Sequence, residues 1–118
     1  MASPLVFFQV ATSAPARTWA FLSEIFDWAA SEADESGAFA IGLAGPADFD
    51  VQGQLMPAGD GAQQTTLYFR VDDLEATVAL AGERGVSIVM PATLLPIGVH
   101  VAMIRTPDDA LTVGIVQA

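Results

Sequence analysis

The sequence predicts a single α+β domain built from two β-α-β-β-β modules, about residues 1–58 and 62–118. Three observations lead to this fold class. The chain has 118 residues, the length of one domain, and 53% of them are apolar, which is enough to bury a core. A strand motif near the N-terminus recurs 61 residues later. Each copy is followed by a helix pattern and then by further strands, so one supersecondary unit is repeated.

In the first module, residues 6–10 (VFFQV) form a β-type run, and residues 38–44 and 51–56 are two later strand candidates. A helix is expected from Pro15 to about Phe26, because Ser13 can serve as its N-cap and proline is favoured in the first turn. We expect its buried face to consist of residues spaced by three and four, namely Thr18, Phe21, Leu22 and Ile25.

In the second module, residues 67–71 (LYFRV) repeat the first strand. Asp72 and Glu75 have the spacing of a capping box, which predicts a helix that runs to Arg84 with Gly85 just beyond its end. Three strands should follow, in residues 87–91 and a little beyond, 100–105 and 111–117.

The charge balance excludes one class of partner. Four basic and fourteen acidic residues give a net charge of −10, and free nucleic acid needs a basic face. Eight of the fourteen acidic residues fall between Arg17 and Arg70, where there is no other base. This acidity either serves solubility or attracts a cationic ligand.

Composition also bears on compartment and membrane. Cysteine is absent, which excludes disulfides and thiolate chemistry. The first residues lack the basic region of a secretory signal, so a cytoplasmic protein is expected. The longest apolar stretch, residues 88–104, contains two prolines and a glycine and is too short to span a bilayer, so no membrane partner is expected.

Three segments together resemble the motifs of the vicinal oxygen chelate superfamily, which includes glyoxalase I, bleomycin resistance proteins and extradiol dioxygenases. They are residues 21–28 (FLSEIFDW), residues 68–74 (YFRVDDL) and the run from Ile104 to Ile115. The chain departs from the family at Asp109-Ala110, where Gly-Asn is usual, with one extra residue before the last strand. The resemblance implies a half-open mixed β-barrel, with helices on its convex side and a ligand cavity on its concave side.

Period-two alternation assigns the two faces of each strand. The residues expected under the helices are Val6, Phe8, Val10, Val51, Leu55, Leu67, Phe69, Val71, Val113 and Ile115. The residues expected to bind a ligand are Phe7, Gln9, Gln52, Gln54, Thr66, Tyr68, Arg70 and Thr112, together with His100. For His100 an ordinary strand position is the other interpretation, beside a ligand contact or a weak general base.

The family's metal ligands, transferred by motif, fall on Leu5, Gln54, Thr66 and Gly114. Only Gln54 has a coordinating side chain, and a lone amide oxygen does not hold a divalent cation. We therefore expect neither a metal nor another cofactor. No catalytic residue is predicted either, since the chain has a single histidine and no serine in a nucleophile elbow.

Gln9 and Arg70 occupy equivalent places in the two modules, where a closed core would be apolar. With Phe7 and Tyr68 as aromatic walls, they suit a small ligand that bears a carboxylate or carbonyl group. The alternative is that Arg70 pairs with a structural carboxylate. The two tryptophans are expected to be core or dimer contacts rather than ligand platforms.

The sequence thus predicts a small-molecule binding protein of the glyoxalase and bleomycin resistance type, whose ligand is cationic or carbonyl-bearing and is held in the cavity without a metal. An enzyme like glyoxalase or a lyase, with an atypical or absent metal site, is the alternative. A regulatory module with a vestigial cavity is a third hypothesis. A homodimer is expected, because two half-barrels expose sheet edges that a symmetric partner would cover.

Overall fold

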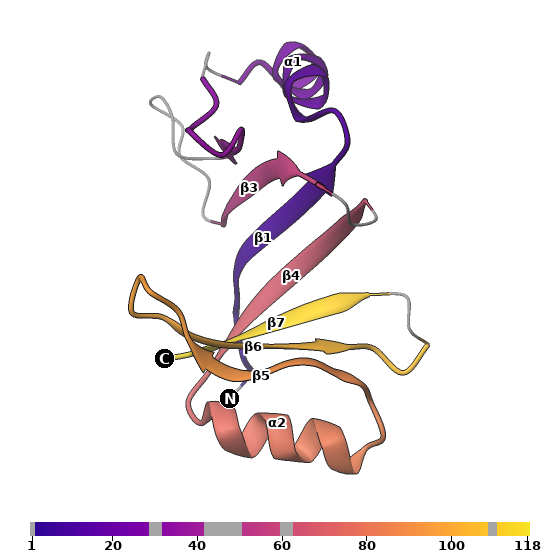
Figure 1. The fold of residues 1–118 in the computed structure, drawn as a ribbon, viewed down its shortest axis with the longest axis vertical. Coiled ribbons are helices and arrows are strands. Elements are labelled where there is room, and N and C mark those ends of the chain that lie inside the picture. The colour runs from indigo at the N-terminus through magenta and orange to yellow at the C-terminus, as the bar shows by residue number, and fades with distance from the viewer. Residues whose placement is uncertain (1, 29–31, 42–50, 60–62, 109–110) are drawn as a thin grey trace. The chain divides into compact units, whose positions relative to one another are not determined.

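The computed structural model describes residues 2–28, 32–41, 51–59, 63–108 and 111–118 (Figure 1). These residues contain two helices and seven strands with both parallel and antiparallel pairing, which is the α+β class predicted. They divide into two units, residues 7–65 and residues 1–6 with 66–118. The first six residues therefore group with the second half of the chain.

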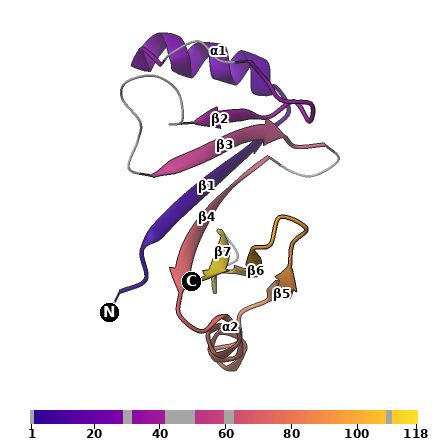
Figure 2. The ribbon, with the colours of Figure 1, turned by 90° about the vertical axis from the view of Figure 1, so that its left-hand side faces the viewer.

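The unit of residues 7–65 holds the first repeat. It comprises most of β1 (Leu5–Thr12), α1 (Pro15–Phe26), β2 (Phe39–Ile41) and β3 (Gln52–Pro57). β3 pairs parallel to β1 and antiparallel to β2, and α1 lies over β2 and β3 (Figure 2). The predicted strand 38–44 is confirmed over β2, and its residues 42–44 lie outside the described part of the chain.

The second unit has the full β-α-β-β-β order. It comprises most of β4 (Gln64–Val71), then α2 (Leu74–Glu83), β5 (Ile88–Leu94), β6 (His100–Arg105) and β7 (Thr112–Gln117). β4 pairs parallel to β7, β7 pairs antiparallel to β6, and β6 pairs antiparallel to β5. α2 packs against β5 and β6 (Figure 1). Neither helix of the described residues is long and apolar enough to cross a membrane.

The core of the first unit is aromatic. Trp19 is buried, and its ring stacks on Phe39 at 5.2 Å and lies 5.4 Å from the Trp28 ring. Of the two roles expected for the tryptophans, core or dimer contact, the structure shows the core role, with Trp28 partly buried against the cluster that contains Trp19. The predicted buried face of α1 is wrong for Phe21 and Ile25, which are 61% and 59% exposed, whereas Thr18 and Leu22 are half-buried. A helix buries one stripe, and α1 is turned so that the large indole of Trp19 fills it.

Both predicted N-caps are also corrected. Ala14 occupies the N-cap of α1 without a side-chain bond, because the Ser13 hydroxyl donates to Oε1 of Gln63, 3.3 Å away. Asp73, and not Asp72, caps α2 and accepts a hydrogen bond from the Ala76 amide.

A long-range contact explains the shifted start of α2. The Gln117 side chain donates to the Asp72 carbonyl at 2.6 Å and accepts from the Leu74 amide at 2.8 Å, so the helix begins after these groups are satisfied. At the other end, Gly85 follows the C-cap residue Arg84 with φ of 80°, as the sequence predicted.

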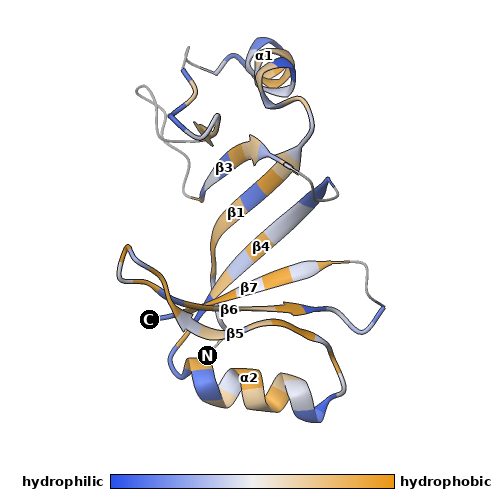
Figure 3. Cartoon of the chain, viewed as in Figure 1, coloured by the Kyte–Doolittle hydropathy of each residue, from blue (hydrophilic) through white to orange (hydrophobic). Residues whose placement is uncertain are grey.

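The second core lies between α2 and the strands. Its members are Val71, Leu74, Ala102 and Ile115, with Val78, Ala92, Ile104 and Val113 packed against them. Figure 3 shows that the hydrophilic residues of α2 gather at its two ends, whereas much of the strand surface is apolar. The helix side predicted for Val71, Val113 and Ile115 is confirmed.

The register of the parallel strand pairs shows that the residue offset between the two copies of the repeat is not constant. Phe7 lies across from Gln52, and the equivalent Tyr68 lies across from Gly114. From β1 to β4 the offset is 61 residues (7 to 68), and from β3 to β7 it is 62 (52 to 114). The second copy of the repeat is therefore one residue longer than the first between its first and last strands. As a consequence, Gln54 corresponds in the repeat to Val116 rather than to Gly114.

The rotation of α1 can be tested by paired substitutions. Trp19→Ala should lower the free energy of unfolding by about 3 to 5 kcal/mol, because it empties an aromatic core. Phe21→Ala should change it by less than about 0.5 kcal/mol, because that ring is mostly exposed. Urea unfolding measures both values. A larger loss for Phe21→Ala than for Trp19→Ala would contradict the observed face.

Candidate functional site

Each unit has a sheet face that points away from its helix. In the first unit this face carries Phe7 and Gln9 from β1 and Gln52 and Gln54 from β3, which we call the amide face. The alternate residues, such as Leu55, belong to the core beneath α1. All four side chains of the amide face are half-buried, and the sequence predicted all four there.

A hydrogen bond joins the two central amides. Gln9 Nε2 donates to Gln54 Oε1 at 3.1 Å, and the two residues are cross-strand partners. This bond fixes the orientation of the Gln54 amide. Its Nε2 has no hydrogen bond to the described residues and can donate to the carbonyl or carboxylate oxygen of a ligand.

In the second unit, the face away from α2 carries two arginines. Arg70 lies on β4 and Arg105 on β6, with Tyr68 on the same face, and we call these three residues the arginine face. Arg105 Nη1 donates to the Thr112 hydroxyl at 3.3 Å. The sequence analysis missed Arg105. Alternation in β6 could have found it, since Ala102 and Ile104 pack in the core and residue 105 points to the other side.

Arg70 is exposed, which bears on its two interpretations. Its backbone amide donates to the Pro4 carbonyl at 3.0 Å, and no ion pair of its guanidinium occurs within the described residues. The interpretation that Arg70 pairs with a structural carboxylate therefore finds no partner in this part of the chain.

The remaining predicted site residues differ in their accessibility. Thr66 and Thr112 lie on the same face as Arg70, and both are buried, at 3% and 6% exposure. His100 is exposed and alternates with Ala102 onto the α2 side of β6. The structure thus does not bring His100 together with the other predicted residues of this unit.

The Tyr68 ring covers Gly114 on the arginine face. Its ring lies over Gly114 so tightly that a Cβ on Gly114 would come within 2.1 Å of the Tyr68 ring. Burial raises the pKa of the Tyr68 phenol above its ordinary value. The phenol is therefore neutral at physiological pH.

The positions at which the fold family places metal ligands do not fit a divalent cation. Leu5 is aliphatic, the Gln54 amide oxygen already accepts from Gln9, and the Tyr68 ring covers Gly114. The described residues also contain no cluster of three His, Cys, Asp or Glu side chains. Val116, which corresponds to Gln54 in the repeat, has no side-chain atom that could coordinate a metal.

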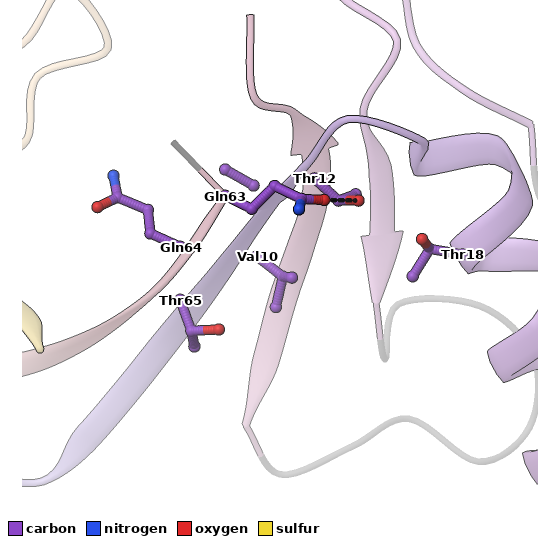
Figure 4. A pocket seen from close by; sticks show the side chains of 7 residues that line it. Val10, Thr12, Thr18, Gln63, Gln64 and Thr65 are labelled. Atoms are coloured by element: carbon purple, nitrogen blue, oxygen red, sulfur yellow. Dashed lines mark hydrogen bonds between the residues drawn. The ribbon is translucent and has the colours of Figure 1, made fainter. Parts of the chain in front are cut away.

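A pocket that the sequence analysis did not anticipate lies where β1 ends and α1 begins (Figure 4). It is open, has a volume of about 350 Å³, and is lined by Val10, Ala11, Thr12, Thr18, Gln63, Gln64 and Thr65. Gln63 Oε1 accepts from the Thr12 hydroxyl and the Ser13 amide, both at 3.1 Å. The lining has hydroxyl and amide groups but no charged side chain, so it offers weak recognition of neutral polar groups.

Comparison with known proteins identifies the fold. No family model and no curated protein matches the chain. A glyoxalase/bleomycin resistance protein/dioxygenase superfamily member from Vibrio splendidus is similar in structure, with a TM-score of 0.65, 13% identity and 98% of each chain covered. A hypothetical protein from Bacillus halodurans has a TM-score of 0.66 and 12% identity, with 100% of this chain and 96% of that chain covered.

A methylmalonyl-CoA epimerase from Mycobacterium tuberculosis is also similar, with a TM-score of 0.59 and 20% identity, over 96% of this chain and 86% of that one. At these identities the likeness concerns the fold. The chain has the vicinal oxygen chelate fold, as its motifs predicted.

The contact between Tyr68 and Gly114 predicts opposite effects for two glycine substitutions. Gly114→Ala should lower the free energy of unfolding by about 1 to 3 kcal/mol, because the ring must move. Gly82→Ala, in α2, should raise it by about 0.5 to 1 kcal/mol, because a Cβ there meets no atom within 4 Å and alanine favours the helix. Denaturant unfolding of both variants measures these changes. Equal effects would argue against the packed ring.

Tyr68 is the single tyrosine of the chain, so its ionisation can be followed by absorbance. It should titrate above 10.0 in the folded protein and near that value in denaturant. Because the folded pKa is the higher one, the free energy of unfolding should fall as the pH rises from the unfolded pKa to the folded pKa. Coincident titration curves in the two states would show that the phenol is not buried.

Proposed function

We propose that this chain is a small-molecule binding protein that holds its ligand against the faces turned away from its helices, without a metal. The observation that carries the proposal is the Gln9–Gln54 amide pair beside Phe7. Burying amides costs free energy unless they are hydrogen-bonded, and here the pairing offsets part of that cost. It also leaves a donor on Gln54 for a ligand.

The residues of the amide face suit a small organic molecule with a carbonyl or carboxylate group. The aromatic ring of Phe7 can contact the apolar part of such a molecule, while the oriented amide can donate to its oxygen. Ligand sites combine a mainly apolar lining with a few polar groups in this way.

An enzyme like glyoxalase or a lyase is the alternative, and similar structures include methylmalonyl-CoA epimerases. Moving a proton at carbon requires a general base. The strands that form the amide and arginine faces, β1, β3, β4, β6 and β7, contain no Asp or Glu, and their single histidine, His100, lies on the α2 side. Neutral Tyr68 is a poor base. Binding without chemistry is therefore the function that these residues support best.

We also propose a homodimer, because the end strands β2 and β5 leave sheet edges that a symmetric partner would cover. Light scattering at a protein concentration of tens of micromolar should give twice the 12.3 kDa mass of one chain. A monomeric mass would contradict this proposal.

Binding at the amide face can be tested with benzamide, a neutral amide with an aromatic ring. Saturation-transfer NMR should detect benzamide on the native chain. The double variant Gln9→Leu/Gln54→Leu should weaken binding about tenfold or more, because it removes the donor.

Gln63→Leu is the matched control, since it alters the pocket beside Thr12 and leaves the amide face unchanged. Loss of benzamide binding in Gln63→Leu but not in the double variant would move the site to that pocket. Chelator-sensitive turnover of a hemithioacetal would instead support the enzyme.

A further inference from the structure

The outer face of α1 carries an exposed aromatic ring between two exposed charges. α1 lies over β2 and β3 (Figure 2), and Trp19 is buried on the sheet side. Phe21 follows Trp19 by two residues, about 200° around the helix, and is 61% exposed. Arg17, Ala20 and Glu24 are also exposed. Because seven residues make about two turns, Arg17 and Glu24 lie along one line of this outer face.

These two charges are placed unfavourably for an isolated helix. The helix dipole leaves partial positive charge at the N-terminus and partial negative charge at the C-terminus. Arg17 lies in the first turn of α1, which has no acidic residue, and Glu24 lies in the last turn, which has no basic residue. In α2 the arrangement is the opposite one, with Glu75 in the first turn and Arg84 at the C-cap.

The two charges also have no partner of opposite sign along the helix. Side chains pair within a helix when they are three or four residues apart. The residues three and four positions after Arg17, and likewise three and four before Glu24, are Ala20 and Phe21. Within the described residues neither charged side chain forms an ion pair. Neither the helix nor its described surroundings therefore accounts for this pattern.

From this pattern we infer that two copies of the chain pair through the outer faces of their α1 helices, in antiparallel orientation. The two-fold axis passes between Ala20 and Phe21. Arg17 and Glu24 are equally far from that centre, so each Arg17 meets the partner's Glu24. Each Arg17 then lies beside the C-terminal turn of the partner's helix, and each Glu24 beside its N-terminal turn, where the helix dipole favours them.

The apolar centre of the face fits the same arrangement. Each Phe21 ring packs against the partner's Ala20, whose small side chain leaves room for it, and this contact removes exposed apolar surface from water. The inference rests on the proposed homodimer and names a contact surface for it, whereas ligand binding at the amide face is a separate matter.

Charge exchange tests the two ion pairs by sedimentation equilibrium. Arg17→Glu and Glu24→Arg should each raise the Kd of the dimer about tenfold or more, because each change places two pairs of like charges in the contact. The double variant Arg17→Glu/Glu24→Arg should return the Kd to within about threefold of the native value, because the pairs re-form with their signs exchanged. Arg84→Glu is the matched control, since it alters the net charge equally but lies at the end of α2.

A change in folding can be separated from a change in pairing. An acidic residue in the first turn suits the helix dipole, so Arg17→Glu should keep or raise the thermal stability of the single chain. Phe21→Ala should raise the Kd about tenfold or more, whereas Leu80→Ala, which alters a half-exposed residue of α2, should not. Unfolding is compared below the native Kd, where all variants are monomers.

A directed cross-link tests the antiparallel register. The chain has no lysine, so Arg17→Lys introduces a single lysine side chain and keeps the positive charge. A carbodiimide joins an amine to a carboxylate that touches it. Peptide mass spectrometry of the linked dimer should find residue 17 of one chain bonded to the partner's Glu24, and Arg17→Lys/Glu24→Gln should lose this bond.

Three results would overturn the inference: a native dimer whose Kd withstands both charge reversals, a double variant as weak as the single ones, or a cross-link from residue 17 to a carboxylate other than the partner's Glu24. Each of them would leave the homodimer to its sheet edges. A monomeric native chain would overturn the inference and the proposed homodimer together, and benzamide binding would still decide the proposed function.

Discussion

An aromatic ring packed over a glycine fixes the register of each parallel strand pair. Phe8 lies over Gly53 where β1 meets β3, and Tyr68 lies over Gly114 where β4 meets β7. A Cβ on either glycine would come within 2.4 Å of its ring, so no larger residue fits without a shift. Because a slip of one residue would turn every side chain to the other face, this contact determines which residues meet the core and which face away.

The two rings differ in where they lie relative to the helix of their own unit, and the polar residues exposed beside them differ accordingly. Phe8 packs into the core beneath α1, which leaves the amide face to the paired glutamines. Tyr68 lies on the face turned away from α2, together with Arg70 and Arg105. The ring thereby covers Gly114, one of the positions at which the fold family places a metal ligand. The same packing that fixes the register thus removes a coordination position.

Much of the fold could be predicted from periodicity, because alternation along a strand depends only on local geometry. The helix-side residues Leu55 and Ile115 and the amide face follow from it. The buried face of α1 could not be predicted in this way. Phe21 and Trp19 both fit an apolar stripe, and only the contact with Phe39 shows that Trp19 is the buried one. The N-caps failed for a related reason. Gln63 and Gln117 reach the helix starts from far along the chain, and local spacing carries no information on such contacts.

The candidate site was predicted only in part. Gln9 and Gln54 were found because polar residues interrupt apolar strands, whereas Arg105 was missed because the faces of β6 were not assigned. The central claim is that the chain binds its ligand with its own side chains and needs no metal. Native mass spectrometry of freshly expressed protein tests it most directly, since it reports metal and retained ligand together. We expect subunits without a stoichiometric metal, whereas one zinc, nickel, iron or manganese ion per subunit would contradict the claim.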